Sequence, residues 1–385
     1  MLTISQLCSL RSVVFDPQKR DTVLDLSDLI SGRIDPDVFF EENYITEGMR
    51  GLLEHAFRRL EGKSEQGVFL LKQAMGGGKT HNLLSLGLLA QHPEYRERVM
   101  GGFHHPDPDL GPVQVIAFSG RETDAPYGIW GALAEQLGQK ELFRELYSPL
   151  RAPGQKAWEN LFRGQRVLIL LDELPPYFQS AKSVQVGNSD LAQVTATALS
   201  NLLVAIGRPG CERVALVITD LAATYREGSA QIAEVLHDLE NETGRTAMSL
   251  EPVRLNSDEL YHILRTRLFE KVPPEEKIGE VAQAYAEAIR KAKQMDMTSE
   301  SPEEFAARVM ASYPFHPGIR DLYARFRENP GFQQTRGLIR LMRLVAANLW
   351  ATGKAKDKLL IGVHDVDLNQ QQIRAEVGQI SSSLG

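Results

Sequence analysis

Cysteine is scarce in this sequence, and its scarcity excludes a fold held together by disulfide bonds. Cys8 and Cys211 are its two cysteines, and they form no C-x-x-C pair. Isolated cysteines suit a reducing compartment, whereas small secreted domains carry dense disulfide frameworks. We therefore expect a cytoplasmic protein whose stability comes from a hydrophobic core.

Long apolar runs are also missing. No stretch approaches the ~18–20 apolar residues that span a bilayer, and the N-terminus lacks the basic start and apolar centre of a signal peptide. We therefore expect no membrane partner. The net charge of −7 is mild and argues against a protein that coats nucleic acid without sequence preference. With 385 residues, 43% of them hydrophobic, the chain can form two domains with substantial cores.

What the sequence does contain is a glycine-rich loop between a predicted strand and a predicted helix. Val68–Lys72 is short and apolar, residues 73–78 end in three glycines, and leucines follow Thr80 at helical spacing. This is the arrangement of a phosphate-binding loop, G-x-x-x-x-G-K-[ST], except that Gln73 stands where the pattern has its first glycine. The alternative interpretation is a flexible turn ahead of an ordinary helix.

The chemistry of phosphate binding assigns roles within this loop. Glycines let backbone N–H groups converge on phosphates, and the helix N-terminus adds partial positive charge. We expect Lys79 to contact the β- and γ-phosphates and the Thr80 hydroxyl to bind Mg²⁺. The predicted ATP-binding residues of this stretch are Met75, Gly76, Gly77, Gly78, Lys79, Thr80 and His81.

A second nucleotide signature follows the apolar run Val167–Leu171. A run that is apolar throughout fits a central parallel strand covered on both faces, and ligands bind at the carboxyl ends of such strands. The run ends in Asp172 and Glu173. We expect Asp172 to hold Mg²⁺ through water and Glu173 to deprotonate the attacking water. The alternative, an ordinary acidic turn, does not explain why the pair follows the Gly-Lys-Thr loop.

Three further strands complete the predicted sheet, at Val113–Phe118, Val214–Ile218 and Ser249–Leu255. Thr219 ends the second of these, and we expect it to contact the γ-phosphate or the attacking water. Asp220 is the alternate for that role.

Two segments outside these strands carry weaker signals. Tyr44 and Ile45 lie upstream of the first strand, where many P-loop ATPases contact the adenine ring, although both could be simple core contacts. The loop after the glycine-loop helix contains His104, His105, Asp107 and Asp109. These could bind a metal, but the prolines between and beside them favour a solvated turn.

From residue 256 onward the apolar spacing becomes helical, with a strong helix at Leu338–Leu349 and one last strand at Leu359–Val363. We therefore divide the chain into four parts. They are an N-terminal extension (1–35), an α/β nucleotide-binding domain (36–255), a helical domain (256–360) and a C-terminal tail (361–385).

This constellation resembles the AAA+ branch of P-loop ATPases over residues 36–350. The resemblance implies a three-layer αβα domain, with a parallel sheet of strand order 5-1-4-3-2, followed by a helical lid. Gly337-Leu338-Ile339-Arg340 is similar to the start of the lid helix, which makes Arg340 the γ-phosphate sensor and Arg336 the runner-up. Arg245 lies just ahead of the fifth strand, where the superfamily has an arginine finger that serves a neighbouring subunit.

A narrower resemblance rests on LKQAMGGGKTHNLLSLGLLA (71–90), YPFHP (313–317) and FQQTRGLIRLM (332–342). These stretches are similar to an uncharacterised family of large prokaryotic AAA+ ATPases, which also carry glutamine at the opening of the loop and are usually longer than this chain. Their genes often lie beside DNA methyltransferases, helicases and nucleases in restriction or antiphage islands. The resemblance implies protein effectors of a modification or defence complex as partners.

Together these features predict an ATPase that uses Mg²⁺ and ATP to drive remodelling or movement. The AAA+ resemblance implies a dimer or ring in which the arginine finger acts between subunits. Residues 316–360 contain nine Lys or Arg against three acidic residues, which makes DNA an expected partner unless this is a solvated face. The alternative is an ATP-dependent switch or scaffold that recruits an effector and hydrolyses slowly. A small-molecule kinase shares the loop but lacks the long helical lid and the Asp-Glu pair.

Overall fold

The computed structural model describes residues 2–16, 24–73, 76–219, 241, 243, 245–253, 258–326 and 332–381. The chain divides into two compact units. The αβ unit comprises Val23–Phe40 and Ile45–Val253. The helical unit comprises Met1–Thr22, Glu41–Tyr44 and Arg254–Gly385.

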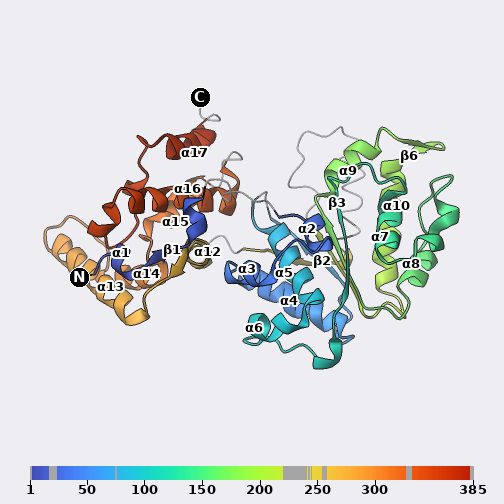
Figure 1. Cartoon of the computed structure of the whole chain (residues 1–385), viewed down its shortest axis with the longest axis horizontal. Coiled ribbons are helices and arrows are strands. Elements are labelled where there is room, and N and C mark those ends of the chain that lie inside the picture. The colour runs from blue at the N-terminus through green and yellow to red at the C-terminus, as the bar shows by residue number, and fades with distance from the viewer. Residues whose placement is uncertain are drawn as a thin grey trace. The chain divides into compact units, whose positions relative to one another are not determined.

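A five-stranded parallel sheet forms the centre of the αβ unit (Figure 1). Its strand order is β3-β4-β7-β2-β8, which is 5-1-4-3-2 when the strands are counted along the chain, as predicted. Every pairing is parallel, so the carboxyl ends of the strands lie at one edge. The strands are β2 (Val68–Leu71), β3 (Gln114–Ser119), β4 (Val167–Asp172), β7 (Val214–Thr219) and β8 (Met248–Leu250). The first four begin and end within one residue of their predicted bounds, whereas β8 is shorter than predicted.

Helices cover both faces of this sheet, which confirms the α/β class. Successive residues of β4 point to opposite sides, so that Leu168 and Leu170 enter one core while Ile169 and Leu171 enter the other. Figure 1 shows α4 and α5 on one side of the sheet and α7, α8 and α10 on the other. The central strands β2, β4 and β7 are buried at every position, and they are apolar up to their carboxyl ends because neither face meets water there.

The helices of the αβ unit fall into two groups by the core to which they contribute. On one face lie α2 (Leu26–Ile30), α3 (Pro36–Glu41), α4 (Glu47–Leu60), α5 (Lys79–Gln91) and α6 (Arg96–Met100). On the other lie α7 (Gly128–Gln136), α8 (Gln155–Phe162), α9 (Leu174–Ala181) and α10 (Leu191–Ile206). A small hairpin of β5 (Gln185–Val186) and β6 (Ser189–Asp190) connects α9 to α10.

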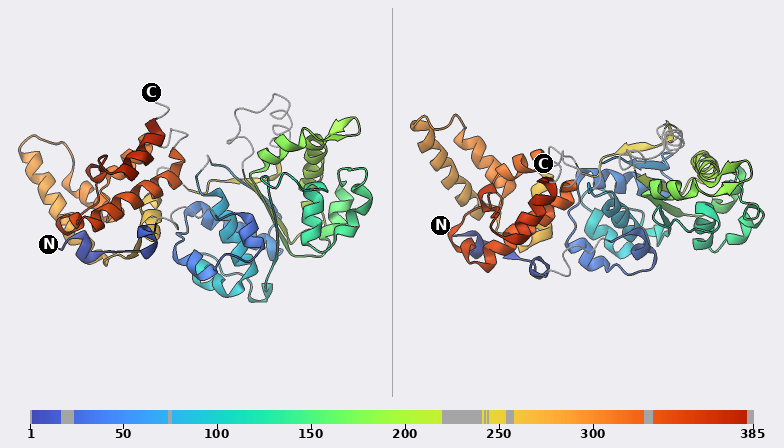
Figure 2. Two further views of the ribbon diagram at one scale, coloured as in Figure 1. Left: turned by 45° about the horizontal axis from the view of Figure 1, so that its top comes forward. Right: turned by 90° about the horizontal axis from the view of Figure 1, so that it is seen from above.

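The helical unit is built around one apolar core. Its helices are α1 (Ile4–Leu7), α12 (Glu259–Leu268), α13 (Glu275–Gln294), α14 (Pro302–Ser312), α15 (Gly318–Phe326), α16 (Gln334–Ala351) and α17 (Gln371–Ser381). Helices α13 and α14 pack side by side and are drawn in orange in Figure 2. An antiparallel pair of β1 (Ser9–Leu10) and β9 (Phe269–Lys271) joins the N-terminal segment to α12.

Both ends of the chain differ from the sequence-based division. Residues 1–35 are not a separate extension, because β1 pairs with β9 and Ile4 is buried in the helical core, while Leu29 of α2 is buried in the αβ unit. Residues 361–385 are not merely a tail, because they contain α17, whose Ile373 is buried in the helical core. The predicted strand at 359–363 is reduced to an isolated bridge between Phe315 and Ile361. Among the described residues we find no helix with the length and apolarity needed to cross a bilayer.

A buried arginine holds α4 against the loops at the amino edge of the sheet. Arg59 is 4% exposed, and its guanidinium donates to five backbone carbonyls. Burial lowers the pKa of Arg59, and bonds to carbonyl oxygens offset the cost of burying its charge. The acceptors belong to Ser64, Glu65, Ile206, Cys211 and Val214.

We expect Arg59→Met to lower the free energy of unfolding by about 3–5 kcal/mol, because methionine fills the space but leaves buried carbonyls without donors. Arg58→Met is the matched control, since Arg58 lies on the same helix with a side chain that is 50% exposed. Its expected change is below about 0.5 kcal/mol. Urea unfolding followed by tryptophan fluorescence measures both, and equal stabilities of the two variants would contradict the role of Arg59.

Candidate functional site

The candidate site lies at the carboxyl edge of the sheet. The neighbouring strands β3, β4, β7 and β2 end there at Ser119, Asp172, Thr219 and Leu71. Ser119 is opposite Asp172, and Thr219 is opposite Leu71. The strand order therefore brings the glycine loop, the acidic pair and Thr219 together, although they are far apart in the sequence.

Asp172 is the buried centre of this edge. It is 4% exposed, and its two carboxylate oxygens accept hydrogen bonds from Thr80 Oγ1 at 2.6 Å and Thr219 Oγ1 at 2.7 Å. Burial raises the pKa of Asp172, and the two hydroxyl donors oppose that rise. The bond from Thr80 joins the first turn of α5 to the acidic end of β4.

Thr219 orients both acidic residues rather than pointing away from the protein. Its hydroxyl donates to Asp172 and accepts a bond from the Glu173 backbone N–H at 3.1 Å. The residue is 1% exposed. In this geometry Thr219 fixes the carboxylate of one residue and the backbone of the next. The alternate, Asp220, lies outside the described residues.

The glycine loop has a backbone for which glycine is needed. Gly76 and Gly78 have φ values of 80° and 88°, in the left-handed region that side chains disfavour. Gly78 is the N-cap of α5, whose first turn leaves N–H groups without intrahelical partners. Lys79 Nζ donates to the backbone carbonyl of Gln73, the residue that opens the loop. Met75 lies outside the described residues, and Gly77 is buried.

Glu173 has a strained backbone and a basic neighbour. Its φ of 48° and ψ of 43° place it in the left-handed region, which costs a residue with a side chain about 1–2 kcal/mol. Gly120 allows the close approach, because a Cβ there would lie 1.9 Å from the Glu173 carbonyl oxygen. The Glu173 carboxylate contacts Arg121 Nε, from the loop after β3. Sequence reasoning missed Arg121, since only the strand order places the β3 loop beside the end of β4.

His81 of the loop helix and the adenine candidates Tyr44 and Ile45 each contact other side chains of the chain. His81 stacks on Phe39 of α3, with ring centroids 4.6 Å apart. Tyr44 belongs to the helical unit and stacks on His262 at 4.9 Å. Ile45 is half-buried against the core of α4 and α5. Of these three residues, His81 is the one that lies beside Lys79 and Thr80 on α5.

Comparison with protein-family models covers both units. The model described as the DUF499 N-terminal domain matches residues 6–101 and 112–247, and the model described as the DUF499 second domain matches residues 256–382. The chain belongs to the DUF499 family. The border between the two structural units, after Val253, falls in the interval between the two matches. No curated protein matches the DUF499 chain.

The three arginines predicted to act on the nucleotide differ in exposure and in partners. Arg340 is paired with Glu376 of α17, with Nη2 2.8 Å from Oε1, and both side chains are largely buried. Arg336, the runner-up, is exposed. Arg245 is also exposed and precedes β8, at the edge of the sheet opposite Asp172. It therefore lies away from the candidate site of its own chain.

The basic excess of residues 316–360 is partly neutralised by acids from outside that range. Carboxylates of four residues, at positions 258, 376, 367 and 365, pair with Arg320, Arg340, Lys354 and Lys358 respectively. Surface charge is what attracts a nucleic-acid backbone, and paired charges contribute little. The segment is thus a weaker candidate for DNA binding in the DUF499 chain than its sequence suggests.

The histidines of the loop before β3 do not converge. His104 Nε2 lies 3.8 Å from Glu61 Oε1, whereas His105 Nδ1 lies 3.2 Å from Glu97 Oε2. Burial lowers the pKa of His104. Across the described ranges no group of three or more His, Cys, Asp or Glu side chains has the arrangement of a metal site.

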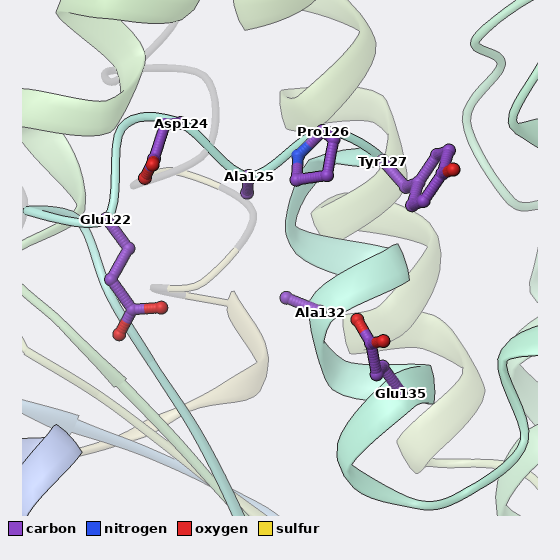
Figure 3. A pocket seen from close by; sticks show the side chains of 7 residues that line it. All are labelled: Glu122, Asp124, Ala125, Pro126, Tyr127, Ala132 and Glu135. Atoms are coloured by element: carbon purple, nitrogen blue, oxygen red, sulfur yellow. The ribbon is translucent and has the colours of Figure 1, made fainter.

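A separate hollow of about 240 Å³ opens between the loop after β3 and α7 (Figure 3). Three of its lining residues are acidic, Glu122, Asp124 and Glu135, and burial raises the pKa of Glu122. Figure 3 shows Glu122 and Asp124 on the loop and Glu135 on the helix. Carboxylates repel phosphate groups, so the hollow is unsuited to a polyphosphate.

Proposed function

We propose that this chain is an ATPase of the P-loop, AAA+ type that binds ATP at the glycine loop and hydrolyses it. The observation that carries the proposal is the 2.6 Å hydrogen bond between Thr80 and Asp172. In a P-loop ATPase these two positions hold the same metal ion. A flexible turn ahead of an ordinary helix gives no reason for this contact, because nothing would then hold the Thr80 hydroxyl at the Asp172 carboxylate.

The residues at this edge suit Mg²⁺. Hard oxygen ligands on one or two residues, with water and substrate phosphates completing the shell, are what Mg²⁺ prefers. Thr80 Oγ1 and the buried carboxylate of Asp172 supply such oxygens, and a carboxylate kept from water gains from a cation. When bound, Mg²⁺ would neutralise charge on the β- and γ-phosphates.

The chain's own residues would act by position and charge. Lys79 would exchange the Gln73 carbonyl for phosphate oxygens, and the N–H groups of Gly76–Lys79 would bind the phosphates. Glu173 would accept a proton from the attacking water once its carboxylate left Arg121. Thr219 would hold Asp172 and the Glu173 backbone still during this exchange.

A second candidate function is an ATP-dependent switch or scaffold with slow hydrolysis. The contact between Arg121 and Glu173 favours it, because the Glu173 carboxylate must leave the arginine before it can reach the attacking water. In this version ATP binding recruits an effector, and ATP is hydrolysed only after Arg121 has been displaced from Glu173.

The wider setting of the proposal rests on the AAA+ resemblance. Arg245, remote from Asp172 within its own chain, would act as a finger in a neighbour's site, which requires a dimer or a ring. The work driven by ATP would be remodelling or movement within a prokaryotic DNA modification, restriction or antiphage system, with Arg340 relaying loss of the γ-phosphate. In that role Arg340 would first have to leave Glu376.

Steady-state phosphate release, with and without duplex DNA, tests this proposal. An ATPase that moves on DNA should speed up at least about tenfold with DNA at low salt, and lose that gain as salt rises. A switch should turn over slowly in both conditions while its oligomeric state, followed by light scattering, depends on ATP. No hydrolysis and no ATP-dependent assembly would overturn both versions.

A further inference from the structure

The glutamine that departs from the phosphate-loop pattern makes specific contacts through its side chain. Gln73 Nε2 donates to the Val253 carbonyl at 3.1 Å, and the Val253 N–H donates to Gln73 Oε1 at 3.0 Å. One carboxamide thus satisfies both backbone groups of Val253, as a peptide unit of a neighbouring strand would. The pairing continues the β2–β8 ladder past its last backbone bond, from Lys72 N–H to the Leu250 carbonyl at 2.9 Å.

The backbone of Gln73 takes part in the loop itself, because its carbonyl accepts the bond from Lys79 Nζ. One residue therefore holds the loop lysine with its main chain and Val253 with its side chain. Any ligand that draws Lys79 to its own oxygens removes a donor from the Gln73 carbonyl. The loop with ligand and the loop without ligand therefore differ in the bonding of Gln73, the residue that also binds Val253.

Val253 is the last residue of the αβ unit before the chain crosses to the helical unit. The two residues before it contact the segment where the chain returns to the αβ unit, at Ile45. Thr46 Oγ1 donates to the Pro252 carbonyl at 2.5 Å, and a Cβ at Gly48 would lie 1.8 Å from the Glu251 carbonyl oxygen. We call Glu251–Val253 the exit segment.

We propose that Gln73 is a positioning residue that couples nucleotide occupancy of the glycine loop to the exit segment. The inference rests on the proposed ATP-binding function and adds its regulation. Bound phosphates order the loop through Lys79 and several N–H groups, contacts that outnumber the single bond lost at the Gln73 carbonyl. The Gln73 carboxamide then leaves Val253 less often, and the exit segment opens less often. Glycine, the residue that the pattern has at this position, possesses no side chain with which to make this connection.

The alternative is that Gln73 only holds the β2 and β8 segments together and takes no part in coupling. The chain offers a matched control that tests this alternative. Gln66 connects the same two segments at the other end of the pair. Its Nε2 donates to the carbonyls of Val68 at 2.6 Å and Thr246 at 3.0 Å. It lies away from the loop. Gln66→Met and Gln73→Met therefore each remove a glutamine side chain that connects the β2 and β8 segments, at opposite ends of the pair, and only the second should break the coupling.

Hydrogen exchange of the full chain, with and without saturating Mg²⁺·ATPγS, tests the proposal. In the wild type, nucleotide should slow exchange in peptides covering both Gly76–Leu83 and the exit segment, the latter by about 5-fold or more, the lower range of ordinary site coupling. In Gln73→Met, the loop peptide should still respond while the exit segment should not. In Gln66→Met, both responses should persist. Gln73→Glu keeps the acceptor for the Val253 N–H but loses the donor, so its exit segment should respond partially.

Two results would overturn the coupling while leaving ATP binding intact. One is an undiminished response of the exit segment in Gln73→Met or, should that variant not fold, in Gln73→Glu. The other is an equal loss of response in Gln66→Met. If nucleotide changes exchange nowhere in the wild type, the proposed function itself fails and the coupling fails with it.

Discussion

Lys79→Ala is expected to weaken the binding of Mg²⁺·ATP by at least about 100-fold, which corresponds to about 2.7 kcal/mol. The ammonium group is the cation that meets the β- and γ-phosphates in a phosphate-binding loop, and charge-assisted bonds to phosphate are among the strongest in proteins. In the structure Lys79 Nζ is held next to the loop, on the Gln73 carbonyl. Isothermal titration with a slowly hydrolysed ATP analogue measures the change.

Lys72→Ala is the matched control for the loss of one positive charge. Lys72 is exposed and follows β2 immediately before Gln73. Its replacement should change the dissociation constant by no more than about twofold, as expected of a solvated charge. Equal losses in the two variants would mean that binding responds to general charge, and would contradict the specific role of Lys79.

Glu173→Gln is expected to lower the rate of ATP hydrolysis by about 10²–10⁴-fold while leaving ATP binding within a few-fold of the wild type. Glutamine keeps the size of the side chain but cannot accept the proton of the attacking water. The protein should therefore hold unhydrolysed ATP after rapid gel filtration. Single-turnover phosphate release and the ratio of bound ATP to ADP measure the two effects.

Glu122→Gln supplies the control, because it makes the same chemical change in the acidic hollow beside the loop after β3. It should leave turnover near the wild-type value. Normal turnover in Glu173→Gln would contradict the assignment of Glu173 as the general base. A loss of ATP binding in that variant would instead give Glu173 a part in holding the nucleotide.

The sheet could be predicted because its strands carry a strong signal. Strands buried on both faces must be apolar throughout, so runs such as Val167–Leu171 are short, continuous and distinctive. The ends of the chain could not be predicted in the same way. β1 and β9 have two and three residues, and what pairs them is contact between segments that are about 260 residues apart, which no local pattern reports.

In the candidate site, too, local motifs could be predicted from the sequence and contacts between distant segments could not. Thr80 and Asp172 were predicted from local motifs, and the structure brings them into contact. Arg121 and the Gln73–Val253 pairing were missed, because each depends on which loops the strand order places together. The surroundings of Arg340 could not be foreseen either, since its partner Glu376 lies in a segment that the sequence marks as a tail.

Determination of the structure with Mg²⁺ and a non-hydrolysable ATP analogue tests whether the glycine loop binds nucleotide. We expect phosphates bound by the backbone of Gly76–Lys79 and by the Lys79 ammonium, with the metal held by Thr80 and, through water, by Asp172. Phosphates bound at any other place, with Lys79 still on the Gln73 carbonyl and Thr80 still on Asp172, would contradict this expectation.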